Sequence, residues 1–276
     1  MSLLRIVCAL SALVLGLGSA VGQSQQREKV SEGQYQKYRE GKLTAEGNQS
    51  WILWHMPDGR YELEDHFHLG NPAAEFAAAV GSRNLAPQLR QEMAGEMLQT
   101  EVDVKLSVDL KIESLTVKGT RLLDGKAVEL ETCSKAGQQI RCKGQSGGAK
   151  LNNDGPDEFF YSFPFPMLSL GLIQRGATQV GVPVTLKLAV MELVPFDHPR
   201  VKLSHCRGLL TLAGEEQIQL GDRPYTTNKY ILEVDSKADP LKLTFWLNKK
   251  LVVAMTEETF PGERLQLVEY KKFSDF

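Results

Sequence analysis

One segment of the chain, residues 100–118, constrains the fold more than any motif does. Its apolar side chains fall on alternate positions, and the positions between them are charged or hydroxylated. Alternation with a period of two places successive side chains on opposite faces of a β-strand. The apolar set is Val102, Val104, Leu106, Val108, Leu110 and Ile112, and the polar set is Asp103, Lys105, Ser107, Asp109, Lys111 and Glu113. The pattern predicts one long strand with a dry face and a wet face.

The parity of the apolar positions changes near the end of this segment. Ile112 occupies an even position, whereas Leu115 and Val117 occupy odd positions. One extra residue in a strand shifts the pattern in this way, so we expect a β-bulge at Glu113 and Ser114. Six apolar side chains on one strand contribute about 9–18 kcal/mol if they are fully buried. Such a face does not stay bare in water, and something must therefore cover it.

Further segments carry similar strand signals, separated by turn residues such as Pro57-Asp58-Gly59 and Asn248-Lys249-Lys250. Strands are expected over residues 34–38, 50–56, 60–69, 127–132, 182–190, 201–212, 229–234, 241–247, 251–256 and 265–270. Two stretches depart from this pattern. Within residues 71–98, an alanine-rich segment favours helix over 73–79. Pro87 can begin another helix over 87–93, and the alternative there is extended structure that leads into the long strand. Residues 144–156 are rich in Gly, Asn and Asp and predict a mobile loop.

The N-terminal segment resembles a secretory signal. Arg5 provides a positive start, residues 6–17 are apolar, and Ala20-Val21-Gly22 forms a small-residue cleavage site. We therefore expect residues 1–22 to be a signal peptide, residues 23–32 to be disordered, and residues 33–276 to form one β domain. The apolar stretch is too short for a comfortable membrane span, so no stable span is expected after cleavage. The expected location is secreted or periplasmic.

The net charge of −2 leaves no strong basic excess, which argues against nucleic acid as a partner. Three of the four cysteines remain after signal cleavage. Cys133 and Cys142 flank a turn-like segment and can form a disulfide in an oxidising compartment. The alternative is two reduced thiols. Cys206 has no evident partner and is expected to act as a small buried hydrophobic residue.

The most aromatic part of the chain is residues 159–165, followed by a short helix that Pro166 is expected to begin. These large apolar side chains have two interpretations. They can pack as ordinary core beneath the sheet. Alternatively, residues 163–173 can form a plug over the dry face that an apolar ligand partly displaces.

Residues with catalytic or metal-binding chemistry are few. His66 and His68 share one strand face and provide two ligands for Zn²⁺ or Cu²⁺, although a solvated polar face is the favoured explanation of the pair. Gly144-Gln145-Ser146-Gly147-Gly148 matches a nucleophile-elbow pattern. It lacks the buried strand before it and the helix after it that this motif requires. No phosphate-binding glycine loop is present, and no cofactor is expected.

Three short motifs give the chain a family resemblance. They are Gly33-Gln34-Tyr35, Tyr38-Arg39-Glu40-Gly41, and a closing hairpin over residues 245–252 that carries Trp246. In their order, these features resemble uncharacterised secreted bacterial proteins of the lipoprotein-carrier-like half-barrel type. The resemblance implies a strongly curved antiparallel sheet that wraps around short helices and can hold an acyl chain. It implies no catalytic residues.

We therefore predict a mainly β protein, built as a single curved antiparallel half-barrel with a few short helices on its concave side. The favoured function is non-enzymatic binding of an apolar envelope ligand, a lipid or an acyl chain. The residues predicted to line the site are Val104, Leu106, Val108, Leu110, Phe163, Phe165 and Met167. One alternative is a structural or interaction protein of the envelope with a self-filled core. The other is a metal-dependent enzyme that uses the His66 and His68 face. No oligomeric state is predicted.

Overall fold

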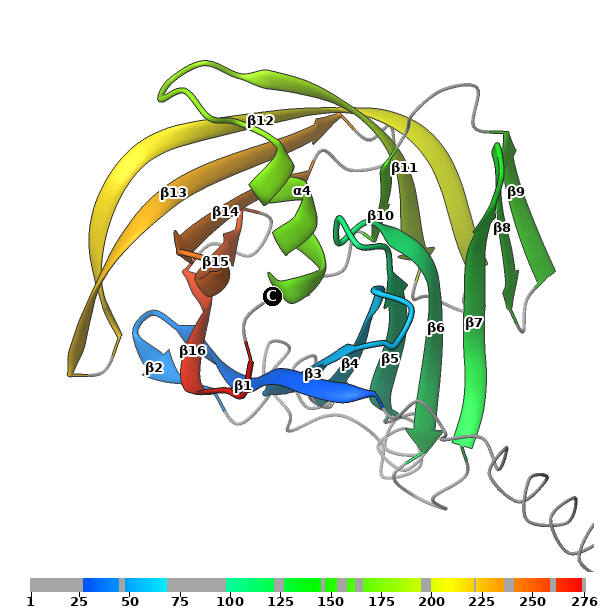
Figure 1. Ribbon diagram of the computed structural model, residues 1–276, viewed down its shortest axis with the longest axis horizontal. Coiled ribbons are helices and arrows are strands. Elements are labelled where there is room, and N and C mark those ends of the chain that lie inside the picture. The colour runs from blue at the N-terminus through cyan, green and yellow to red at the C-terminus, as the bar shows by residue number, and fades with distance from the viewer. Residues whose placement is uncertain are drawn as a thin grey trace, which may run out of the picture.

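Sixteen strands join into one sheet that curves back on itself until its two ends lie close together (Figure 1). This computed structural model describes residues 27–44, 48–68, 98–121, 127–144, 147–152, 158–161, 166–194, 200–220, 222–235, 241–258 and 262–274. Within these residues, no helix combines the length and apolar character needed to cross a bilayer.

The N-terminal half of the sheet contains β1 (Glu28–Arg39), β2 (Lys42–Leu43), β3 (Gln49–His55), β4 (Tyr61–His68), β5 (Leu98–Leu106), β6 (Ile112–Arg121), β7 (Ala127–Ala136), β8 (Gln139–Gly144) and β9 (Gly147–Asn152). The C-terminal half contains β10 (Glu158–Tyr161), β11 (Val184–Val194), β12 (Arg200–Leu220), β13 (Arg223–Asp235), β14 (Leu241–Asn248), β15 (Leu251–Glu257) and β16 (Glu263–Lys272). Between β10 and β11 lie the 3₁₀-helix η2 (Pro166–Ser169) and the α-helix α4 (Leu170–Arg175).

The first and last strands of the sheet in sequence, β1 and β16, pair with each other in the middle of the sheet. The path runs β10-β11-β12-β13-β14-β15-β16-β1-β3-β4-β5-β6-β7-β8-β9, with β2 beside β1. Only the β10–β11 pair is parallel among the described strands. At the far ends, Nε2 of His205 on β12 lies 2.8 Å from the carbonyl oxygen of Asn152 on β9. The predicted mainly β, curved antiparallel sheet is confirmed, and its curvature brings it close to a closed barrel.

The long strand predicted over residues 100–118 is wrong, because the chain reverses within it. β5 and β6 form an antiparallel hairpin whose turn covers residues 107–111. The Ser107 N–H donates to the Lys111 carbonyl oxygen at 2.9 Å, and the Leu110 N–H donates to the Ser107 carbonyl oxygen at 2.9 Å. Leu110 adopts a φ of 59°, which few residues other than glycine tolerate. The alternation continues through this turn, so it gave no sign of the reversal.

The predicted β-bulge is confirmed, although it lies in a hairpin and not in one long strand. Lys105 pairs with Ser114 and Leu106 pairs with Ile112, which leaves Glu113 without a partner position. The two strands keep their apolar residues on the same face because of this extra residue. Val104 and Leu115 are therefore both buried on the inner side of the sheet.

Three inward-facing rows of buried residues cross the N-terminal half of the sheet. Each row runs perpendicular to the strands through directly paired positions. The rows are Ser31, Leu53, Leu63, Val104, Leu115 and Cys133; Gly33, Trp51, Asp65, Val102, Val117 and Glu131; and Tyr35, Gln49, Phe67, Thr100 and Gly119. This arrangement places the core inside the curve of the sheet.

The two helices lie inside that curve and connect its opposite sides (Figure 1). A Cβ atom on Gly171 would lie 2.2 Å from the Leu110 carbonyl oxygen, so α4 packs directly on the β5–β6 turn. A Cβ atom on Gly176 would lie 2.0 Å from Cδ2 of Leu210 on β12. The helix predicted to begin at Pro166 is thus confirmed, and it occupies the concave side.

Two further boundaries differ from those expected. The segment predicted to be disordered, residues 23–32, contains the start of β1 at Glu28, where Val30 and Ser31 are buried. The segment predicted to be a mobile loop, residues 144–156, contains β9, which pairs with β8. The helices expected over 73–79 and 87–93 lie outside the described residues, as does the signal peptide over 1–22.

Candidate functional site

The predicted ligand-binding residues divide into three groups. Val104, Leu106 and Met167 are buried in the interior, and Leu110 packs partly buried against the same core. Val108 is a correction, because it lies in the β5–β6 turn and is 65% exposed. Phe163 and Phe165 lie outside the described residues. The predicted residues that face the interior therefore come from β5, the β5–β6 turn and η2.

We use the word plug for η2 and α4, residues 166–175. Residues 166–173 are buried, and Gln174 is exposed. Ser169, at the N-cap position of α4, makes no side-chain capping hydrogen bond. A six-residue helix has little stability of its own in water, so the plug depends on its apolar packing against the barrel wall.

A polar cluster lies among the apolar residues of the inner wall. Nε2 of Gln49 donates to both carboxylate oxygens of Asp65, at 2.9 and 2.8 Å. The exposed fraction is 1% for Gln49 and 0% for Asp65. Thr100, on the next strand, is also buried. The strands place these three side chains on adjacent positions of β3, β4 and β5.

Burial dominates the electrostatics of this cluster. It raises the pKa of Asp65 well above the usual range, and the hydrogen bond from Gln49 offsets only part of that effect. Burial also raises the pKa of Tyr35 well above its usual value, with Asp65 as a secondary cause. The Tyr35 hydroxyl donates to the Val252 carbonyl oxygen at 2.7 Å, which joins β1 to β15 through the interior.

The predicted disulfide is present between Cys133 and Cys142, which face each other on β7 and β8 with Cα atoms 4.0 Å apart. Its Cys133 Sγ lies 3.1 Å from Sδ of Met191 on β11 and 3.6 Å from Oε1 of Glu131. Glu131 is 1% exposed, and burial raises its pKa to about 7. Cys206 is unbridged and buried, as expected.

The predicted metal pair is not brought together with further ligands in the described structure. His66 lies on the outer face, where Ser50 and Glu101 are its cross-strand neighbours. The side chain of His68 lies outside the described residues. Among the described side chains, the group with metal-ligand spacing is Glu131, Cys133 and Cys142, with ligand atoms within 4.8 Å of one another. Its two sulfurs are joined in the disulfide. A metal at His66 and His68 stays a prediction.

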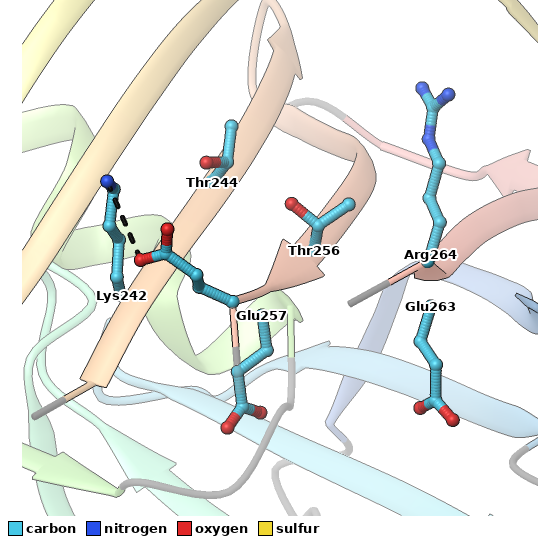
Figure 2. Close-up of a pocket in the computed structure, with 8 residues that line it drawn as sticks. Lys242, Thr244, Thr256, Glu257, Glu263 and Arg264 are labelled. Carbon is cyan, nitrogen blue, oxygen red and sulfur yellow. Dashed lines mark ion pairs between the residues drawn. The ribbon is translucent and has the colours of Figure 1, made fainter. Parts of the chain in front are cut away.

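A hollow with a volume of about 440 Å³ lies at the surface where β15 and β16 diverge (Figure 2). Lys242 and Thr244 line it and alternate along β14 with the buried Leu243, so the hollow is on the outer face. Lys242 pairs with Glu258 at 3.6 Å. The lining mixes two basic and three acidic side chains, and it therefore offers no apolar surface comparable to the interior.

Arg264 borders this hollow, but its guanidinium stacks on the ring of Trp246. The central carbon of its guanidinium lies 4.8 Å from the ring centre of Trp246, which donates to Glu216 at 3.2 Å. Lys229 pairs with the same Glu216 at 3.1 Å. Burial lowers the pKa of Arg264, although Glu216 acts in the opposite direction. This cluster fastens the outer face of β12, β13, β14 and β16 and has a structural explanation.

The pattern GxSxG at residues 144–148 belongs to a hairpin. Gly144 at the end of β8 pairs with Gly147 at the start of β9 in an antiparallel ladder. A nucleophile elbow requires a helix after the serine, whereas a strand follows here. The pattern is therefore not a nucleophile elbow.

In the strand predicted over residues 60–69, Asp65 shares a face with Leu63 and Phe67, but nothing in the sequence marks its role. The parity of these positions was sufficient to put its carboxyl group in the interior. Gln49 and Glu131 were missed because their positions depend on how β3 and β7 align with distant strands.

Comparison with known proteins shows the fold. No family model matches the chain, and no curated protein matches it by sequence. Among solved structures, it is similar to a β-barrel-like protein of domain of unknown function DUF1849 from Brucella abortus. The TM-score is 0.52 at 12% identity, over 90% of this chain and 99% of that one. The likeness establishes the fold. At this identity it says nothing of activity.

Two other solved structures are similar at lower scores. A DUF1089 family protein from Pseudomonas aeruginosa has a TM-score of 0.39 at 12% identity, over 83% of this chain and 92% of that one. A hypothetical lipoprotein, YmcC, from Escherichia coli has a TM-score of 0.31 at 13% identity, over 98% of this chain and 96% of that one. Scores this low carry no structural argument, so the comparison rests on the first structure.

Proposed function

We propose that the barrel interior binds the apolar chain of an amphiphilic envelope molecule, with the plug as its displaceable cover. The proposal rests on one observation, which is how little regular structure covers the apolar wall. A 3₁₀ turn and a six-residue helix, both packed by apolar contacts, fill the concave side. An apolar ligand that reproduces this burial can replace the plug at a small cost in free energy.

The proposed location is secreted or periplasmic. Two features support it: the signal-like residues 1–22 and the disulfide between Cys133 and Cys142. Structural disulfides persist in oxidising compartments. An envelope location would give the interior access to lipids and acyl chains, which supports the choice of ligand class.

The test measures ligand uptake by the processed chain and by two variants of the plug. Native mass spectrometry with added 1-monoacylglycerol is expected to show a one-to-one complex. Leu172→Ala removes a buried contact of α4, and Gln174→Ala changes an exposed residue of the same helix. The plug competes with the ligand for the apolar wall, so weakening the plug should raise the apparent affinity for ligand. L172A should therefore bind the ligand more tightly than the wild type, and Q174A should bind it with unchanged affinity.

The second candidate function is a structural or interaction role with a permanent plug. It is favoured by the complete burial of residues 166–173, which leaves the plug part of the core. Absence of uptake by the wild type and by L172A would exclude the binding proposal and favour this role. If the wild type takes up ligand but L172A binds it no more tightly, ligand binding is retained and the proposal that the plug is displaced is wrong.

A further inference from the structure

The interior wall carries a polar cluster that its apolar role does not require. Gln49, Asp65 and Thr100 lie on three adjacent strands, β3, β4 and β5. Gln49 pairs directly with Phe67, which in turn pairs with Thr100, and Asp65 lies two residues before Phe67 on β4. Asp65 is therefore diagonal to Gln49 on one side and to Thr100 on the other, and side chains at such positions on neighbouring strands are about 7–8 Å apart or less. Asp65 lies between the other two, which are separated by the strand that carries Phe67.

Two atoms of this group have no hydrogen-bond partner among the described residues. Oε1 of Gln49 and Oγ1 of Thr100 are buried and have no hydrogen-bond partner within the described part of the chain. The Gln49 amide already donates to Asp65. A buried polar atom without a partner costs about 1–3 kcal/mol. Ser31 Oγ, Trp51 Nε1 and Glu131 Oε2 on the same rows also have no partner among the described residues. The two atoms that flank Asp65 are grouped, and grouped unpartnered atoms indicate a ligand that supplies the missing partners.

The charge state of Asp65 limits what that ligand can be. No lysine, arginine or histidine of the described residues forms an ion pair with Asp65. An isolated carboxylate in an apolar interior is strongly unfavourable, so the carboxyl group stays protonated. The cluster then presents one acidic O–H donor, one amide acceptor and one hydroxyl that both donates and accepts.

We propose that Gln49, Asp65 and Thr100 form a headgroup site for a neutral, hydroxyl-bearing amphiphile such as a monoacylglycerol. This inference rests on the proposed function, because the acyl chain occupies the apolar interior. A hydroxyl headgroup both donates and accepts, which matches the two unpartnered atoms and the acidic O–H of Asp65. An anionic head would find no cation among the described residues of this cluster. An ammonium head would require Asp65 to ionise inside an apolar wall.

Glu131 defines the other side of the same wall. It lies on the row of Asp65, three strands away, with Val102 and Val117 between them. At a strand spacing of about 4.8 Å, their backbones are roughly 14 Å apart along the sheet. Glu131 is therefore not part of the headgroup cluster.

The test compares ligands that share one acyl chain and differ only in the head. The processed protein is titrated with a 1-monoacylglycerol, the matching methyl ester, the ionised fatty acid and the matching alkylammonium. Two or more added hydrogen bonds should make the monoacylglycerol bind at least about tenfold more tightly than the methyl ester. Thr100→Val removes one hydroxyl with little change of shape and should reduce this preference about threefold or more.

Two further variants separate headgroup recognition from general damage. Thr120→Val makes the same change on the outer face of β6, next to Gly119, which is the strand partner of Thr100. It should leave the preference for monoacylglycerol over methyl ester unchanged. Asp65→Asn keeps a neutral donor of similar size and should retain the preference within about threefold. If D65N abolishes it, or if the alkylammonium or the fatty acid binds best, the neutral-head site is wrong.

The same titration distinguishes this inference from the proposed function. Equal binding of the monoacylglycerol and the methyl ester would overturn the headgroup site and retain the apolar binding function. Binding of none of the four ligands would overturn the proposed function and the headgroup site with it.

Discussion

At the scale of single residues, Glu131 is the group whose burial has the clearest consequence for stability. It is 1% exposed, and Oε2 has no partner within the described residues. Burial raises the pKa of its carboxyl group to about 7, above an ordinary value of 4.5. The folded state thus holds a proton that the unfolded state releases. The stabilisation is fully present below the ordinary pKa and is lost as the pH rises through about 7.

Glu131→Gln should remove this part of the pH dependence. The amide is neutral at every pH, so the variant avoids the cost of a buried carboxylate. We expect it to be about 3 kcal/mol more stable than the wild type at pH 8, because the pKa of Glu131 is raised from 4.5 to about 7 and each pKa unit is worth about 1.4 kcal/mol. At pH 5 the difference should be less than about 1 kcal/mol. Urea unfolding at both pH values measures the difference.

The matched control is Glu269→Gln, which changes an exposed carboxyl group on β16 and should leave the pH dependence as it is. Asp65, whose pKa is also raised by burial, contributes to the same loss of stability, so E131Q should reduce the slope without removing it. An E131Q curve parallel to the wild-type curve between pH 5 and 8 would contradict this assignment.

The residue scale also shows what a sequence can and cannot reveal about the site. Alternation placed Val104 and Leu106 on the inner wall, because their faces follow from strand parity alone. It placed Val108 there too, wrongly, since a turn interrupts the strand. The pairing of Gln49 with Asp65 could not be predicted, because it depends on the register between two strands.

At the scale of elements, the β5–β6 hairpin shows why strand boundaries were harder to predict than strands. Its turn contains neither Gly nor Pro, and Leu110 adopts a positive φ without the residue type that usually signals it. The bulge at Glu113 was detectable because it changes parity. The reversal was not, because the alternation runs through it.

The plug is held by close packing of α4 on that same turn, which gives a second prediction. Gly171→Ala adds a Cβ atom that would lie 2.2 Å from the Leu110 carbonyl oxygen. Alanine favours helix over glycine by about 1 kcal/mol, so any net loss must come from the contact. We expect a loss of about 1–3 kcal/mol in the free energy of unfolding. Gln174→Ala, at an exposed position of α4, should cause no loss. A G171A protein as stable as Q174A would contradict this packing.

The disulfide between β7 and β8 gives a third prediction. It closes a short loop, with a sequence separation of 9 between its cysteines, and should contribute about 2–3 kcal/mol. The double variant Cys133→Ser and Cys142→Ser should lower the urea midpoint accordingly. The denatured, processed wild type should titrate one thiol, that of Cys206, and Cys206→Ala should titrate none. Three titratable thiols in the wild type would show that the bridge is absent.

At the scale of the whole molecule, the resemblance to half-barrel proteins predicted the architecture, but it did not predict how far the sheet closes. Closure depends on contacts between residues far apart in the sequence. β1 pairs with β16, and β9 meets β12 through Asn152 and His205. Local patterns carry no information about such pairings, whereas they identify most of the strands themselves.

The hydrogen bond from Tyr35 to Val252 tests how the first and last strands of the chain are held together on the inner face of the sheet. The two residues are 217 positions apart, and the donor and acceptor oxygens are 2.7 Å apart. Tyr35→Phe removes the donor and keeps the buried ring. We expect a loss of about 1 kcal/mol in the free energy of unfolding. Because the bond joins both ends of the chain, hydrogen exchange should accelerate in β1 and β15 together.

Tyr38→Phe is the matched control on the same strand. Its hydroxyl lies 3.4 Å from Oε1 of Gln36, a neighbour only two positions away, and the side chain is half-buried. Removing this local contact should change stability by only a few tenths of a kcal/mol. If Y35F and Y38F are equally stable, or if Y35F accelerates exchange in β1 alone, the interior bond does not join the two ends. Closure would then rest on the β1–β16 ladder.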